Sequence, residues 1–125
     1  MGRHVPLRYE ARCRLQKEKL DAAVRELVLV CGKVGGILEI YAFGSYARDS
    51  VAAESDLDAL IIRETEERRV RREDDIRALL RAPVDFDLLV ITPYERIHVL
   101  PQNPMGRHIL AEARLLHRYP HQEGQ

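Results

Sequence analysis

The sequence predicts an α/β (α+β) fold in which helices pack on a small mixed β-sheet. Two observations predict it: a long stripe of apolar residues at helical spacing near the start, and short apolar runs of strand length that alternate with helical segments. The chain has 125 residues, 46% hydrophobic and 32% charged, which is typical of a globular protein. We expect a single domain over 1–125 with its core at about 12–118.

The first half is expected to begin with a helix from about residue 12 to residue 33. Its apolar stripe consists of Leu20, Ala23, Val24, Leu27, Val28 and Cys31. A glycine-rich stretch at 32–36 ends this helix. Ile37–Phe43 follows as a buried strand, and a Gly-Ser pair then opens a short helix over 44–50.

The second half continues the alternation. Asp56–Arg63 is predicted to be a strand, and Thr65 is expected to cap a charged helix that runs to about residue 81. Mixed charges four residues apart suit an exposed helix there. Val84–Ile91 is the third expected strand.

Two short helices and a closing strand are expected at the end of the domain. Thr92 and Glu95 have the spacing of a capping box, with Pro93 at the first helical position. A loop at 101–106, a helix near 107–113 and a strand near 114–117 follow.

Charge and cysteine content limit the partners and the location. The formal net charge is zero, so we expect no direct binding of nucleic acid. The two cysteines, Cys13 and Cys31, fall on one predicted helix and cannot pair with each other there, which favours the reducing cytoplasm. Residues 1–16 are too polar for a secretion signal, and no apolar stretch approaches the ~20 residues of a membrane span.

Carboxylates stand at the head of two predicted strands. Asp56 and Asp58 are one residue apart, so a strand there would point both to one face, where their repulsion raises the pKa or demands a cation. Asp85 and Asp87 open the third strand and, taken alone, fit a solvated strand end. Beside the first pair they favour an oxygen-rich Mg²⁺ site, of the kind that transfers phosphoryl or nucleotidyl groups with two ions about 3.5–4 Å apart.

A small-residue turn supplies the other half of the predicted site. Gly44 lets the backbone approach a phosphate, and Ser45 adds a hydroxyl. Arg48, one helical turn on, could reach the same triphosphate. A Gly-Ser pair after a strand is weak evidence for a phosphate-binding turn by itself. The Asp-x-Asp downstream strengthens this interpretation.

Together these residues resemble the signature of the DNA polymerase β-like nucleotidyltransferases. Phe43-Gly44-Ser45, ten intervening residues and Asp56-Leu57-Asp58 match it, and Ala47, Arg48 and Ser55 match the motif of the small members called minimal nucleotidyltransferases. The family's third carboxylate lies on a strand that ends in Thr-Pro, and counting back from Thr92-Pro93 selects Asp87 rather than Asp85. The chain has Asp49 where the family usually has glycine, and Ala59 where leucine is commoner.

The resemblance implies a polymerase β-like fold and a role for each site residue. Asp56 and Asp58 would hold two Mg²⁺ ions, and Asp87 would complete the catalytic metal site and help activate the attacking hydroxyl. Gly44, Ser45 and Arg48 would bind the nucleotide, with ATP as the common donor. Asp49 places a negative charge near the triphosphate, which would weaken binding unless it points outward.

The resemblance also implies a biological role. Minimal members frequently act as antitoxins of a small helical HEPN-type toxin, and some transfer AMP to a tyrosine of that partner. The missing acceptor-binding domain implies that a HEPN-type partner, a second copy of the chain, or both, supply that surface. The alternatives are an antitoxin that neutralises its partner by binding alone, and an enzyme that modifies a small molecule such as an antibiotic.

Overall fold

The fold is built on a four-stranded mixed sheet. The computed structural model describes residues 8–120, and its strands are β1 (Ile37–Phe43), β2 (Leu57–Arg63), β3 (Phe86–Ile91) and β4 (Arg114–Arg118). Their order across the sheet is β3-β2-β1-β4. β1 runs antiparallel to β2 and β4, whereas β2 and β3 are parallel. The predicted mixed sheet with helices on it is confirmed.

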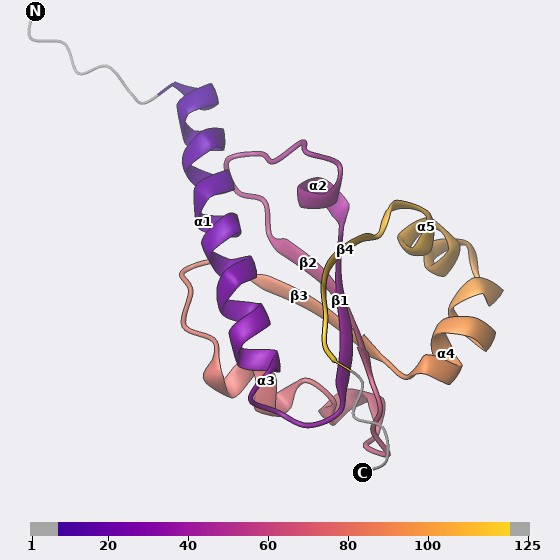
Figure 1. Cartoon of the computed structure of the whole chain (residues 1–125). Coiled ribbons are helices and arrows are strands. Elements are labelled where there is room, and N and C mark those ends of the chain that lie inside the picture. The colour runs from indigo at the N-terminus through magenta and orange to yellow at the C-terminus, as the bar shows by residue number, and fades with distance from the viewer. Residues whose placement is uncertain (1–7, 121–125) are drawn as a thin grey trace, which may run out of the picture.

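Helices cover both faces of this sheet. The long helix α1 (Tyr9–Cys31) lies on one face, and α4 (Pro93–His98) and α5 (Pro104–Glu112) lie on the other (Figure 1). Side chains of β2 alternate between two buried clusters: Leu57, Ala59 and Ile61 belong to the cluster that contains α1, and Leu60 and Ile62 to the cluster that contains Ile109 of α5. By the same alternation, Asp58 faces the side of α4 and α5.

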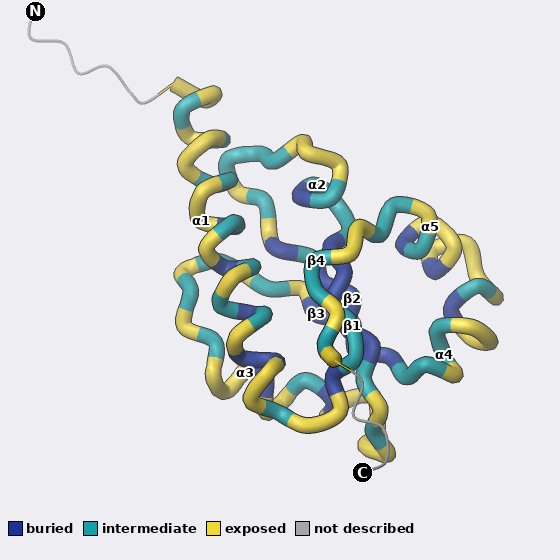
Figure 2. The backbone as a smooth tube through the Cα atoms, in the orientation of Figure 1, coloured by how far each residue is buried: buried dark blue, intermediate teal, exposed yellow. Residues whose placement is uncertain are grey.

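The apolar stripe predicted for the first helix is confirmed. The fully buried side chains of α1 all lie in its second half, and they are Leu20, Ala23, Leu27, Val30 and Cys31. The first turns are exposed, as Figure 2 shows at the upper end of α1. The helix begins at Tyr9, three residues before the expected start. Cys13 and Cys31 are both free, as expected.

The single charged helix predicted over 65–81 is wrong. The segment contains a 3₁₀ turn, η1 (Arg69–Arg71), and a short helix, α3 (Asp74–Leu79). Thr65 caps no helix, because its hydroxyl accepts a hydrogen bond from the amide of Glu67 within a local turn. One of the expected ion pairs between residues four apart does form, and it joins Glu73 and Arg77.

Two arginines with tertiary partners explain the break in that helix. Arg72 is buried and donates to Glu95 at the start of α4 at 2.6 Å. Arg63 of β2 pairs with Asp75 at 2.7 Å. These buried or half-buried pairs are stronger than the exposed pairs of a surface helix, so they fix the path of the segment.

The end of the domain matches the sequence prediction with one shift. The capping box of Thr92 and Glu95 starts α4 as predicted. A 3₁₀ turn, η2 (Leu100–Gln102), occupies part of the expected loop, and α5 begins at Pro104 rather than near 107. The earlier start follows from Asn103, whose side chain accepts a hydrogen bond from the amide of Gly106 at 2.7 Å.

Asp49 occupies a backbone conformation that favours glycine. The short helix α2 (Gly44–Ala47) ends before the expected Ser50, and Asp49 has a φ of 60°. We expect Asp49→Gly to raise the free energy of unfolding by about 0.5–1 kcal/mol, because glycine relieves this left-handed strain. Asp49→Ala is the control and should destabilise. Thermal unfolding of both variants checks the prediction, and a stabilised Asp49→Ala would contradict it.

Candidate active site

The structure brings the heads of β2 and β3 together. The two strands are parallel, Asp58 pairs in register with Asp87, and the amide of Leu57 donates to the carbonyl of Asp85 at 2.9 Å. Residues paired across parallel strands project to the same side, so Asp58 and Asp87 are neighbours on one face. Asp56 lies one residue before β2, exposed at the same edge.

The electrostatics of Asp58 reflect this crowding. Burial, and then the nearby charges of Asp87 and Asp56, raise the pKa of Asp58 from its ordinary 3.8 to about 6. Arg48 opposes this shift, and Glu112 adds to it. A half-buried carboxylate among other carboxylates is stabilised by a bound cation, which lowers its pKa again.

The donor set fits Mg²⁺ in its chemistry. Carboxylate oxygens from two adjacent strands are the ligands this ion prefers. Within residues 8–120, no three acidic, histidine or cysteine side chains are already grouped closely enough to hold a metal ion. Asp56 and Asp87 are exposed, so rotation of their side chains can bring their oxygens toward Asp58.

Gly44 lies directly against the carboxylates. Phe43 of β1 pairs with Asp58, and Gly44 follows with a φ of 74°. A Cβ atom at Gly44 would overlap a carboxylate oxygen of Asp58 and lie 3.0 Å from its Cγ. Glycine is therefore needed for the backbone conformation and for the close approach. The predicted proximity of the turn and the acidic strand is present.

Glu112, which the sequence analysis did not single out, meets the predicted nucleotide-binding residues. The amide of Gly44 donates to Oε2 of Glu112 at 3.1 Å, and Nη1 of Arg48 donates to both carboxylate oxygens at 2.9 and 3.1 Å. One signal was available, because Glu112 is the sole acidic residue between positions 96 and 122. The hydroxyl of Ser45 makes no hydrogen bond within residues 8–120, and so is free to bind a ligand.

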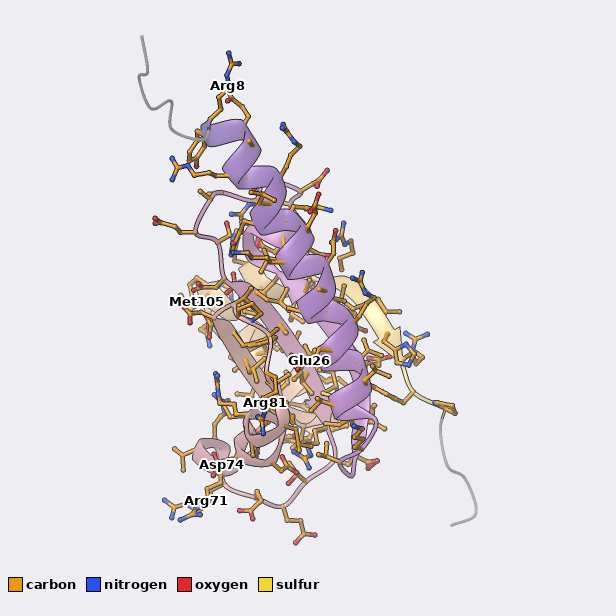
Figure 3. All side chains as sticks on the ribbon, turned by 90° about the vertical axis from the view of Figure 1, so that its left-hand side faces the viewer. Arg8, Glu26, Arg71, Asp74, Arg81 and Met105 are labelled. Atoms are coloured by element: carbon orange, nitrogen blue, oxygen red, sulfur yellow. The ribbon has the colours of Figure 1, made fainter. Side chains whose placement is uncertain are left out.

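Residues of α1 hold the segments that carry the site. Gln16 donates to the carbonyl of Ser55, just before Asp56, at 2.7 Å. The carboxylate of Glu26 accepts from the amides of Arg81 and Ala82 at 2.7 and 2.9 Å, on the approach to β3; Figure 3 shows Glu26 and Arg81 near each other. These contacts fix where each acidic strand begins.

A hollow of about 450 Å³ adjoins the acidic strand heads. Its polar lining includes Gln16, Ser55, Asp56 and Asp85. Asp85 therefore opens toward this hollow together with Asp56, whereas Asp87 pairs in register with Asp58. The hollow therefore adjoins Asp56, and its lining does not include Asp58, Asp87 or Gly44.

Asp58 supplies a pH prediction. Since its pKa is higher in the folded protein than in the unfolded chain, its contribution to stability is complete below about pH 4 and is lost as the pH rises through about 6. We expect the metal-free protein to lose stability over this range, and Asp58→Asn to remove that part of the loss. Thermal unfolding in chelator at several pH values compares the two proteins. Equal pH dependence in both would contradict the assignment.

An acidic pair on adjacent strands, with a glycine turn against it, is the arrangement that the sequence motif of a nucleotidyltransferase predicts. The sequence profile described as the nucleotidyltransferase domain matches residues 17–119, which include both acidic strands and the turn. The chain belongs to this family and is a nucleotidyltransferase. No curated protein sequence matches the chain.

Solved structures share the fold. A proposed nucleotidyltransferase from Sulfolobus solfataricus has a TM-score of 0.61 and 21% identity, covering 94% of this chain and 92% of that one. A toxin–antitoxin structure with AMP-PNP has a TM-score of 0.50 and 18% identity, covering 82% of this chain and 73% of that one. Across residues 8–120, none of the helices combines the length and apolar character needed to cross a bilayer.

Proposed function

We propose that the chain transfers AMP from ATP to a hydroxyl group of a partner protein, with the help of two Mg²⁺ ions. One observation carries the proposal: the parallel register sets Asp58 beside Asp87, and Gly44 lies against Asp58. An acidic pair of this kind accommodates cations, and the turn next to it accommodates the phosphates those cations accompany.

The three carboxylates have different roles in this reaction. Asp56 and Asp58 would hold both ions, and Asp87 would complete the catalytic metal site. When bound, the ions neutralise the charge that develops on the triphosphate and lower the pKa of the attacking hydroxyl. The acceptor oxygen forms a bond to the α-phosphorus, the bond from that phosphorus to the bridging oxygen breaks, and pyrophosphate leaves. Asp87 accepts the hydroxyl proton and passes it to water.

The turn orients the donor. Ser45 and Arg48 contact the triphosphate, and Gly44 keeps the backbone close enough for them to do so. The hydroxyl of Ser45 is free, and the side chain of Arg48 is 53% exposed, so both can reach a ligand. The hollow, whose lining includes Gln16, Asp56 and Asp85, leaves room for the acceptor group beside Asp56.

The acceptor we propose is a tyrosine of a HEPN-type toxin, with the chain acting as its antitoxin in the cytoplasm. The shared fold with a toxin–antitoxin structure that contains AMP-PNP supports this choice. Exposed apolar side chains in the α4–α5 region are available to the partner or to a second copy of the chain; they are Tyr94, Ile97, Val99 and Met105.

The test is a transfer assay. The chain is incubated with Mg²⁺, ATP labelled in the α-phosphate, and the toxin that we expect the neighbouring gene to encode, in parallel with the Asp56→Ala, Asp58→Ala double variant. Label on the toxin with the wild type alone is the expected result. Equal neutralisation of the toxin by both forms, with no label transferred, would overturn the proposal in favour of an antitoxin that acts by binding.

A further inference from the structure

We propose that Glu112, the last residue of α5, is a positioning residue that holds the Gly44 turn and Arg48 in place for the nucleotide. This inference rests on the proposed function, because it concerns the same triphosphate. It adds a residue that touches no substrate and acts through the Gly44 turn and Arg48.

The contacts make Glu112 a bridge between the turn and the arginine. Its carboxylate accepts from the backbone amide of Gly44 and from Nη1 of Arg48 at the same time. The Glu112 side chain is 13% exposed, whereas that of Arg48 is 53% exposed, so the anchor is half-buried and the arginine reaches toward solvent. Burial works to raise the pKa of Glu112, but these hydrogen bonds, together with the charges of Arg48 and His108, outweigh it and keep the pKa below its ordinary value.

Sheet pairing fixes both ends of this bridge. Glu112 is two residues before Arg114, which opens β4 and pairs in register with Ala42 of β1. Gly44 is two residues after Ala42, directly after the end of β1. The guanidinium of Arg114 also lies 5.4 Å from the ring centre of Tyr46, in the turn helix α2. The carboxylate and the turn are therefore held at a set distance by neighbouring strands, as positioning requires.

Arg48 remains able to bind an anion while it is held. A guanidinium has five N–H donors, and Glu112 engages a single nitrogen, Nη1. Within residues 8–120, Nε and Nη2 of Arg48 make no other hydrogen bond. Because the amide of Gly44 is already bonded to Glu112, the phosphates depend on Arg48 and Ser45 instead.

The opposite role would be that of an internal competitor, in which the carboxylate occupies the place of a phosphate and must leave before ATP binds. The two roles predict opposite changes in ATP affinity when Glu112 is replaced. Removing a positioning residue weakens ATP binding, and removing a competitor strengthens it.

Calorimetric titration of the full chain with ATP and Mg²⁺ separates these roles. We expect Glu112→Ala to weaken ATP affinity about tenfold or more, since a charge-assisted contact of this kind is lost. Glu112→Gln keeps an acceptor for the Gly44 amide and should weaken ATP affinity less than Glu112→Ala does. Glu66→Ala, an exposed glutamate in the 64–68 loop, is the matched control and should bind ATP as the wild type does.

A double-variant cycle with Arg48→Ala tests whether Glu112 acts through the arginine. The effect of Arg48→Ala should shrink in the Glu112→Gln background, which a purely structural role of Glu112 would not produce. Additive effects, or unchanged or tighter ATP binding by the Glu112 variants, would overturn the inference alone. Failure of the wild type to bind ATP would overturn the proposed function and this inference with it. If Glu112→Ala does not fold, the Glu112→Gln cycle decides.

Discussion

Asp58→Asn should reduce nucleotidyl transfer by at least about a thousandfold, which corresponds to about 4 kcal/mol of transition-state stabilisation. Asp58 is the central carboxylate, because it lies in register with Asp87, next to Asp56 and against Gly44. Asparagine retains the shape but removes the charge that holds the cations. Initial rates of label transfer at saturating ATP and Mg²⁺ give the measurement.

The matched control is Asp85→Asn, at the head of the neighbouring strand. Asp85 faces the hollow with Asp56 rather than pairing in register with Asp58, so we expect this variant to keep most of the activity. The same Asp58→Asn protein should be more stable than the wild type at neutral pH without metal, since a crowded carboxylate is gone. A measured gain in stability of Asp58→Asn would exclude misfolding as the cause of its loss of activity. A fully active Asp58→Asn enzyme would contradict the site.

The second large effect is expected at Gly44. Gly44→Ala places a methyl group on the carboxylate of Asp58 at a backbone φ of 74°, so the turn must move or the carboxylate must turn away. Strain in this region costs about 1–3 kcal/mol, and we expect a loss of this size in the free energy of unfolding. Displacement of Asp58 should also reduce transfer by about a hundredfold or more.

Gly35→Ala is the control for this substitution. Gly35 lies in the turn before β1, and a Cβ atom there would have no neighbour within 4 Å. Chemical denaturation and transfer rates of the two alanine variants separate the particular demand at Gly44 from the general cost of replacing glycine. Similar behaviour of the two variants would show that Gly44 has no special role.

The strands and the acidic pair were predictable because their signals are local. Apolar runs of strand length, the Gly-Ser pair and the Asp-x-Asp spacing are all read within a few residues of one another. The choice of Asp87 over Asp85 came from the family resemblance. The parallel register gives it a physical basis, since it sets Asp87, and not Asp85, opposite Asp58.

Features set by distant contacts were not predictable in this way. The charged segment after β2 has strong helical character, but Arg72 reaches Glu95 in α4 and Arg63 reaches Asp75, which divides the segment into η1 and α3. Glu112 was missed for the same reason: its role depends on β4 returning beside β1, and a lone acidic residue in a stretch without others does not by itself indicate a site.

The most direct test of the central claim is nuclear magnetic resonance of the labelled chain with Mn²⁺ in place of Mg²⁺ and a non-hydrolysable ATP analogue. Paramagnetic broadening locates the ions. We predict that the amide signals of Gly44, Ser45, Asp58 and Asp87 broaden first, while Gly36, at the opposite end of β1, stays sharp. Broadening centred elsewhere, or none at these four residues, would contradict a shared metal and nucleotide site.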